Sequence, residues 1–128
     1  MKNLGLNSPA TKQQAYAITQ KFVDTINLRD AKALWLEFGI SNAVAEEIHE
    51  SIDEYFEQGT KLSLAPEEHA FDIKEHQRPF IDMYEINDKT VGLECILFAN
   101  GSPGEAILHT EISASEGRIQ LHYKYIGS

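Results

Sequence analysis

Apolar residues return every three or four positions through residues 8–58, which is the period of an amphipathic helix. Ser8 followed by Pro9 has the form of a helix N-cap with proline at the first helical position. The first apolar run is Ala15, Ile18, Phe22 and Ile26. The pattern predicts a first helix that begins at Ser8 and Pro9, after a flexible tail over residues 1–7.

A second, shorter helix is predicted between Asp30 and Gly39. Asp30 has the side chain of an N-cap, and Gly39 is placed where glycine ends helices in the left-handed conformation. Trp35 and Phe38 are the large apolar residues of this helix. We expect both of them to pack in the core between the helices and the sheet.

A third helix is predicted from a cap at Ser41 or Asn42 to about Gln58, before Gly59. Its apolar stripe consists of Val44, Ile48, Ile52, Tyr55 and Phe56. The chain thus has a helical half over residues 8–58.

The period changes to two after Gly59, which predicts strands. The expected strands cover residues 62–64, 80–86, 90–99, 105–113 and 118–126. Residues 67–78 fit neither period well, although Phe71 and Ile73 suggest a brief edge strand. The short connections predict an antiparallel meander over a sheet half, residues 61–126, and therefore a single α+β domain with three N-terminal helices on the sheet.

Turn positions decide which strand residues face the helices, because side chains alternate along a strand. A two-residue loop at Asn87 and Asp88 would place Asp82 and Tyr84 on the helix-facing side. The same register places Tyr123 and Tyr125 on that side. A carboxylate there would act as an acid or base in a pocket, unless it lies on a solvated rim or a bulge shifts the register.

The opposite face of the sheet carries two histidines. A four-residue turn at 114–117 would place His109 directly across from His122, with Glu94 and Glu111 one row away. Two histidines without a definite third ligand are a weak metal signal, so no metal or other cofactor is expected. The apolar residues expected nearby are Ile96, Phe98 and Ile107, which would suit a contact between two copies of the chain.

Composition narrows the classes of partner. The 128 residues include 20 acids against 11 Lys and Arg, for a net charge of −9. Nucleic acid and anionic membranes need clustered cations, so both are disfavoured as partners. The single Cys95 excludes an internal disulfide, and no apolar run has the length of a signal peptide or a membrane span. We therefore expect a cytoplasmic protein.

The charge is concentrated in the third predicted helix. Its acids are Glu46, Glu47, Glu50, Asp53, Glu54 and Glu57, and residues 46–57 contain no Lys or Arg. Glu46–Glu50 and Glu50–Glu54 are like-charge pairs four residues apart, which destabilise a helix. Local energetics therefore do not explain this charge. It is either a solvated face or a docking surface for a basic protein.

Residues 18–38, ITQKFVDTINLRDAKALWLEF, resemble the opening of nuclear transport factor two-like domains. The shared features are the pair Phe22-Val23 near the end of a long helix, a turn with Asn27 and Asp30, and a short helix with an aromatic end. The resemblance implies a curved sheet closed into a cone by helices. Proteins of this shape include isomerases, dehydratases and cyclases, dimeric binding modules, and small immunity proteins that neutralise bacterial toxins.

The sequence is therefore consistent with two functions. The first is a non-catalytic acidic binding protein that neutralises a basic partner, specifically an immunity protein that blocks a toxin such as a nuclease. The alternative is a small-molecule-binding protein or an isomerase- or dehydratase-type enzyme, with Asp82 as general base and Tyr84 or Tyr123 as donor. Against the enzyme, no His–Asp dyad lies on the predicted core face.

Overall fold

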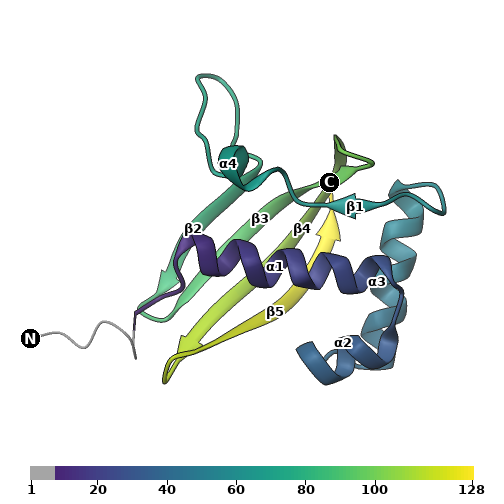
Figure 1. The fold of residues 1–128 in the computed structure, drawn as a ribbon, viewed down its shortest axis with the longest axis horizontal. Coiled ribbons are helices and arrows are strands. Elements are labelled where there is room, and N and C mark those ends of the chain that lie inside the picture. Colours follow the sequence, from purple (N-terminus) through teal and green to yellow (C-terminus); the bar gives the residue numbers. More distant parts are fainter. Residues whose placement is uncertain (1–7) are drawn as a thin grey trace, which may run out of the picture.

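Helices in the N-terminal half of the chain pack against one curled antiparallel sheet, as expected from the sequence (Figure 1). The computed structural model describes residues 8–128, so the tail predicted over residues 1–7 lies outside the described part. The helices are α1 (Lys12–Asn27), α2 (Ala31–Phe38), α3 (Asn42–Tyr55) and the short α4 (Glu67–Ala70). The strands are β1 (Leu62–Ser63), β2 (Ile81–Asn87), β3 (Thr90–Ala99), β4 (Ser102–Ser115) and β5 (Arg118–Gly127).

Helix α1 begins later than predicted. Its N-cap is Thr11, whose hydroxyl accepts from the Gln14 amide while the Gln14 side chain accepts from the Thr11 amide. This reciprocal pair satisfies two amides that the first helical turn leaves without a partner. The prediction that the helix starts at Ser8 and Pro9 is therefore wrong, because the capping box lies three residues further on.

Helix α2 has the predicted ends. Asp30 accepts from the Ala33 amide, and Gly39 closes the helix in the left-handed conformation with a φ of 67°. Phe38 packs edge-on against Phe22 of α1, with ring centroids 5.1 Å apart. The prediction that Trp35 is also a core residue is wrong, because Trp35 is 59% exposed.

Helix α3 begins at the predicted cap and ends early. The Ser41 hydroxyl accepts from the Val44 amide, and the helix stops at Tyr55 rather than near Gln58. Its buried side carries Ala45, Ile48 and Ile52.

The five strands form one sheet in which β3 is central. The order is β1-β3-β4-β5. Strands β1 and β2 pair with the same edge of β3, β1 at Phe98 and Ala99 and β2 along residues 90–95. Within the described residues, β5 is therefore one edge of the sheet, and β1 and β2 together form the other. The brief edge strand predicted at Phe71 and Ile73 is wrong: helix α4 precedes this segment, and Ile73 is 86% exposed on a loop that projects beyond the sheet (Figure 1).

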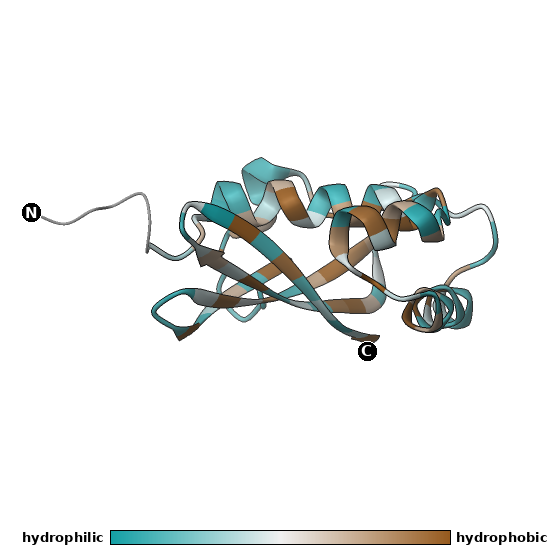
Figure 2. Ribbon diagram, turned by 90° about the horizontal axis from the view of Figure 1, so that it is seen from below, coloured by the Kyte–Doolittle hydropathy of each residue, from teal (hydrophilic) through white to brown (hydrophobic). Residues whose placement is uncertain are grey.

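The core lies between α1 and one face of the sheet. Figure 2 shows α1 running above the sheet, and no helix of residues 8–128 covers the opposite face. The space between them is filled by fully buried side chains that include Phe22, Leu34, Ile81, Leu93 and Leu108. Helix α3 lies beside the β5 end of the sheet rather than over its centre (Figure 1).

The β2–β3 register differs from the prediction by one residue. The turn residues are Asp88 and Lys89, since Asn87 pairs with Thr90 and its side chain accepts from the Lys89 amide. A bulge at Ile86 follows, so Ile81 and Met83 face the helices. A shift of one residue reverses every side chain on a strand. Asp82 and Tyr84 therefore lie on the uncovered face, which corrects the predicted placement of both.

The last hairpin also differs from the prediction. Its turn has two residues, Glu116 and Gly117, both with positive φ, and Ser115 pairs with Arg118. Positive φ at both positions is typical of the turns that fit twisted hairpins. The two extra pairs place Glu111 opposite His122 and, beyond a bulge near Lys124, place Tyr125 opposite His109. The predicted His109–His122 pair is therefore wrong, and Tyr125 lies on the uncovered face.

Candidate binding surface

Four carboxylates share the outward side of α3. Glu46, Glu50, Asp53 and Glu54 are exposed, on the side of the helix opposite the buried Ala45, Ile48 and Ile52. We call these four residues the acidic face. The helical period sets this arrangement, because residues three or four apart lie on one side of a helix.

The other two predicted acids lie at the margins of this face. Glu47 is near enough to β5 that its charge adds to burial in raising the pKa of Tyr123 to about 12. Glu57 comes after the end of α3 and lines a hollow of about 310 Å³ together with Arg29 and Lys61. The structure therefore separates Glu57 from the acidic face, because the helix ends at Tyr55.

Of the six predicted acids, Asp53 alone forms an ion pair with another residue of the described chain. Arg29, in the turn between α1 and α2, donates to both carboxylate oxygens of Asp53, with 3.3 Å from Nη1 to Oδ2. These hydrogen bonds hold the pKa of the Asp53 carboxyl below its ordinary value. Within residues 8–128, Glu46, Glu47, Glu50, Glu54 and Glu57 form no ion pair.

His49 lies beside this ion pair and faces the protein. Its Nε2 atom is buried and has no hydrogen-bond partner among the described residues. Burial lowers the pKa of His49, and the positive charge of Arg29 lowers it further. The ring is therefore held neutral near neutral pH, so it does not offset the negative charge of the acidic face.

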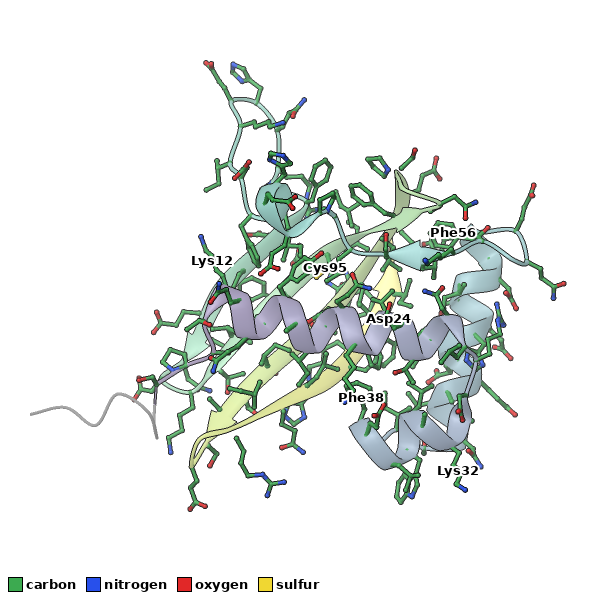
Figure 3. The ribbon with its side chains drawn as sticks, viewed as in Figure 1. Lys12, Asp24, Lys32, Phe38, Phe56 and Cys95 are labelled. Carbon is green, nitrogen blue, oxygen red and sulfur yellow. The ribbon has the colours of Figure 1, made fainter. Side chains whose placement is uncertain are left out.

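A groove of about 480 Å³ separates α2 from the start of β5. The apolar residues that line it are Ile18, Phe38, Ile119 and Leu121, and Trp35 and Leu36 lie on its α2 side. Figure 3 shows Phe38 between α1, α2 and β5, whereas Lys32 points away from the sheet. Leu36 is 68% exposed, so two large apolar side chains of α2 remain largely uncovered.

Sequence reasoning missed this groove because it assigned Trp35 to the core. A signal was present: Leu34 and Phe38, four residues apart, lie on one side of the eight-residue α2, where Leu34 is buried and Phe38 half-buried. Trp35 and Leu36 then point away from that side.

The residues of the predicted catalytic site do not come together. Asp82 and Tyr84 lie on the uncovered face of the sheet, whereas Tyr123 lies on the helix-facing side. The ring of Tyr123 packs near Phe22, with centroids 5.9 Å apart. A general base in a cone-shaped pocket would need Asp82 on the same side as Tyr123, and this geometry does not provide it.

The uncovered face is polar and carries its own contacts. His109 stacks on Tyr125 with ring centroids 4.0 Å apart, and Glu94 accepts from Arg78 at 3.2 Å. His122 lies in a separate contact, with Nε2 2.9 Å from Ser113 Oγ. Within the described chain, no three His, Cys, Asp or Glu side chains converge as a metal site would require. Phe98, which was expected on this face, is buried, so the surface offered to a second copy is smaller than predicted.

Cys95 lies in the centre of β3 and is fully buried. Burial raises the pKa of its thiol far above the ordinary value, so the thiolate needed for reaction does not form. Cys95 therefore acts as a small apolar core residue.

Comparison with known proteins finds no match to this chain among protein-family models, curated proteins or solved structures. The resemblance to nuclear transport factor two-like domains stays a prediction. Across residues 8–128, none of the helices combines the length and the apolar character that a bilayer crossing requires.

Proposed function

We propose that this protein is a non-catalytic binding protein that neutralises a basic partner by covering its cationic surface. The observation that carries the proposal is the acidic face of α3 with Glu47 beside it. Among these five carboxylates, Asp53 alone is paired within the described residues. Like charges four residues apart destabilise a helix. A partner that supplies cations would reduce this repulsion.

The resemblance to small immunity proteins makes a toxin the favoured partner. A nuclease fits the chemistry best, since its active site must be cationic to bind phosphates. A surface of like charges also speeds encounter with an oppositely charged protein through electrostatic steering. No observation favours the enzyme alternative, because Asp82 lies outside the helix-facing side of the sheet.

The test is coexpression of the chain with secreted proteins encoded next to it, followed by affinity purification and measurement of binding. The variant is Glu50→Lys/Glu54→Lys. Its matched control is Glu68→Lys/Glu85→Lys, which changes the net charge equally on α4 and β2, away from α3 (Figure 1). We expect the α3 variant to lose at least about tenfold in affinity and the control to lose little. Equal affinity of both variants would refute the docking role of α3.

A further inference from the structure

We propose that the groove between α2 and β5 receives an extended basic segment of the partner, which adds to β5 as a strand and packs apolar side chains against Trp35 and Phe38. The inference rests on the proposed function, since it takes the partner to be a basic protein. It goes further by naming a second contact, the form of the segment that makes it, and the residues that receive it.

Strand β5 has a free edge within the described part of the chain. Strand β5 pairs with β4 on one side, and no strand of residues 8–128 pairs with its other side. Helix α3 flanks the second half of β5, where Glu47 lies near Tyr123, whereas residues 118–121 line the open groove. Exposed edges are usually blunted by proline, by several charges or by a covering element. Residues 118–121 have no proline and a single charge, Arg118.

The groove combines apolar side chains with polar ones, which include Glu37, Glu116, Arg118 and Gln120. Ile18, Phe38, Ile119 and Leu121 belong to three different elements and converge on one groove. An added strand presents alternate side chains to each face of a sheet, so every second residue of the segment would point toward this lining. Four residues of β5 span about 13 Å, which accommodates about four residues of a paired strand.

Trp35 is exposed beside the groove. Tryptophan is the side chain most enriched at the energetic centre of protein interfaces. Trp35 borders both the groove and a second hollow of about 480 Å³, which also involves Lys32, Ser41 and Asn42. Asn42 lies four residues before Glu46, so it begins the same row of α3 that carries the acidic face. Trp35 therefore lies between the groove and the start of α3, the helix that carries the acidic face.

Charge decides between a basic partner and a second copy as the occupant. The chain carries a net charge of −9, and the hollow on the other side of Trp35 reaches Asn42, the first residue of α3, whose Glu46, Glu50 and Glu54 form no ion pair within residues 8–128. A second copy would bring the same negative charge to that place, whereas a segment rich in Lys or Arg would neutralise it. The structure thus fits an extended segment in which apolar residues alternate with basic ones.

The test uses three synthetic heptapeptides. The first alternates lysine and leucine, the second alternates lysine and serine, and the third is the lysine–leucine peptide with N-methyl groups on the amides that would pair with β5. Trp35 is the only tryptophan in the chain, so its fluorescence reports directly on whether the groove is covered. We expect the first peptide to shift Trp35 emission to the blue and to bind at least about tenfold tighter than the other two.

Protein variants complete the test, with affinity measured by calorimetry. Trp35→Ala and Leu36→Ser change exposed residues, so both variants should fold. We expect each to weaken the lysine–leucine peptide severalfold, Trp35→Ala by about tenfold, and to leave the weak lysine–serine binding unchanged. Glu68→Lys/Glu85→Lys again serves as the control of equal net charge for Glu50→Lys/Glu54→Lys.

Several outcomes would overturn the inference. Equal affinity for the N-methylated peptide would exclude strand addition, and unchanged affinity in Trp35→Ala would exclude the groove. A Trp35-dependent dimer in sedimentation without any peptide would assign the groove to a second copy. If Glu50→Lys/Glu54→Lys lost affinity for the lysine–leucine peptide while Trp35→Ala and Leu36→Ser kept it, the proposed function would stand and the contact in the groove would be refuted. The proposed function would fail on a different result: unchanged affinity of the basic partner for Glu50→Lys/Glu54→Lys.

Discussion

At the scale of single residues, the ring of Tyr84 lies against its cross-strand neighbour Gly92 on the uncovered face. A Cβ atom added to Gly92 would lie 2.3 Å from the Tyr84 ring, a distance that no real pair of atoms tolerates. The Tyr84 ring therefore occupies the place of the missing side chain. Burial, followed by the nearby charges of Glu94, Glu111 and Asp82, raises the pKa of the Tyr84 hydroxyl.

A double-mutant cycle tests this contact. Gly92→Ala should destabilise the protein by about 1 kcal/mol, because the Tyr84 ring must leave its site. In a Tyr84→Ala background the same change should be neutral or should stabilise by up to about 1 kcal/mol, since the unfolded chain loses freedom and the clash is absent. Urea unfolding of the four proteins gives the coupling. Additive effects would show that the ring does not depend on Gly92.

His49 gives a prediction about pH. Its pKa is lowered in the folded state from the ordinary value of 6.5, so between the two values the unfolded chain binds more protons. The free energy of unfolding should therefore be highest above pH 6.5 and should fall as the pH drops below it. His49→Gln removes this contribution and should flatten the profile of stability between pH 7 and 5.

The profile is measured by urea unfolding at each pH. His109, whose pKa is also lowered by burial, adds a second contribution of the same sign. The double variant His49→Gln/His109→Gln should therefore be flatter than either single variant. An unchanged slope in His49→Gln would show that the ring is already charged in the folded protein.

At the scale of elements, the positions of helices and strands were predicted from the sequence more accurately than the faces of the sheet to which strand residues belong. Asp30, Gly39 and the strand Thr90–Ala99 were predicted correctly because caps and period are local signals. The faces of β2 and of the end of β5 could not be predicted, since each depends on one bulged residue. A bulge is chosen by packing across the sheet, so the local pattern does not reveal it.

The acidic residues show the same division between local and tertiary information. Their composition predicted a charged surface on α3, and the 3.6-residue period predicted its side of the helix. The Arg29–Asp53 pair depends on how the turn after α1 meets α3, across 24 positions of sequence. The exposed Trp35 was missed because hydrophobicity alone does not distinguish a core residue from an interface residue.

Helix α3 itself gives the next prediction. Glu50 is flanked by Glu46 and Glu54, so Glu50→Lys converts two repulsive pairs into two attractive ones. We expect this variant to be more stable than the wild type by about 1 kcal/mol at low salt, and Glu50→Gln to gain about half of that. Thermal or urea unfolding measures the gain. A less stable Glu50→Lys would mean that an interaction of Glu50 outweighs both repulsive pairs.

At the scale of the whole molecule, the fold presents two kinds of surface at one end of the sheet. The edge of β5 is unpaired within residues 8–128, and the helix beside it carries charge that the same residues do not neutralise. The opposite end is formed by β1, β2 and α4, and β1 and β2 pair only with β3 within the described residues. The acids without ion pairs and the groove lie together at the β5 end, which is expected where binding competes with stability.

Salt tests whether the acidic face dominates the electrostatics of the whole chain. Raising NaCl from about 10 to 300 mM shortens the range of charge interactions from about 30 Å to below 10 Å. The melting temperature of the wild type should rise, because repulsion within the acidic face and across a chain of charge −9 is screened. Since each Glu→Lys change adds two positive charges, Glu50→Lys/Glu54→Lys carries −5.

The control Glu68→Lys/Glu85→Lys also carries −5, so the two variants differ in the place of the charge and not in its amount. If repulsion is concentrated on α3, the salt-induced rise in melting temperature should shrink far more in Glu50→Lys/Glu54→Lys than in the control. Equal responses would mean that repulsion is spread over the surface. The acids of α3 would then be an ordinary solvated face, and the case for a basic partner at this helix would lose its physical basis.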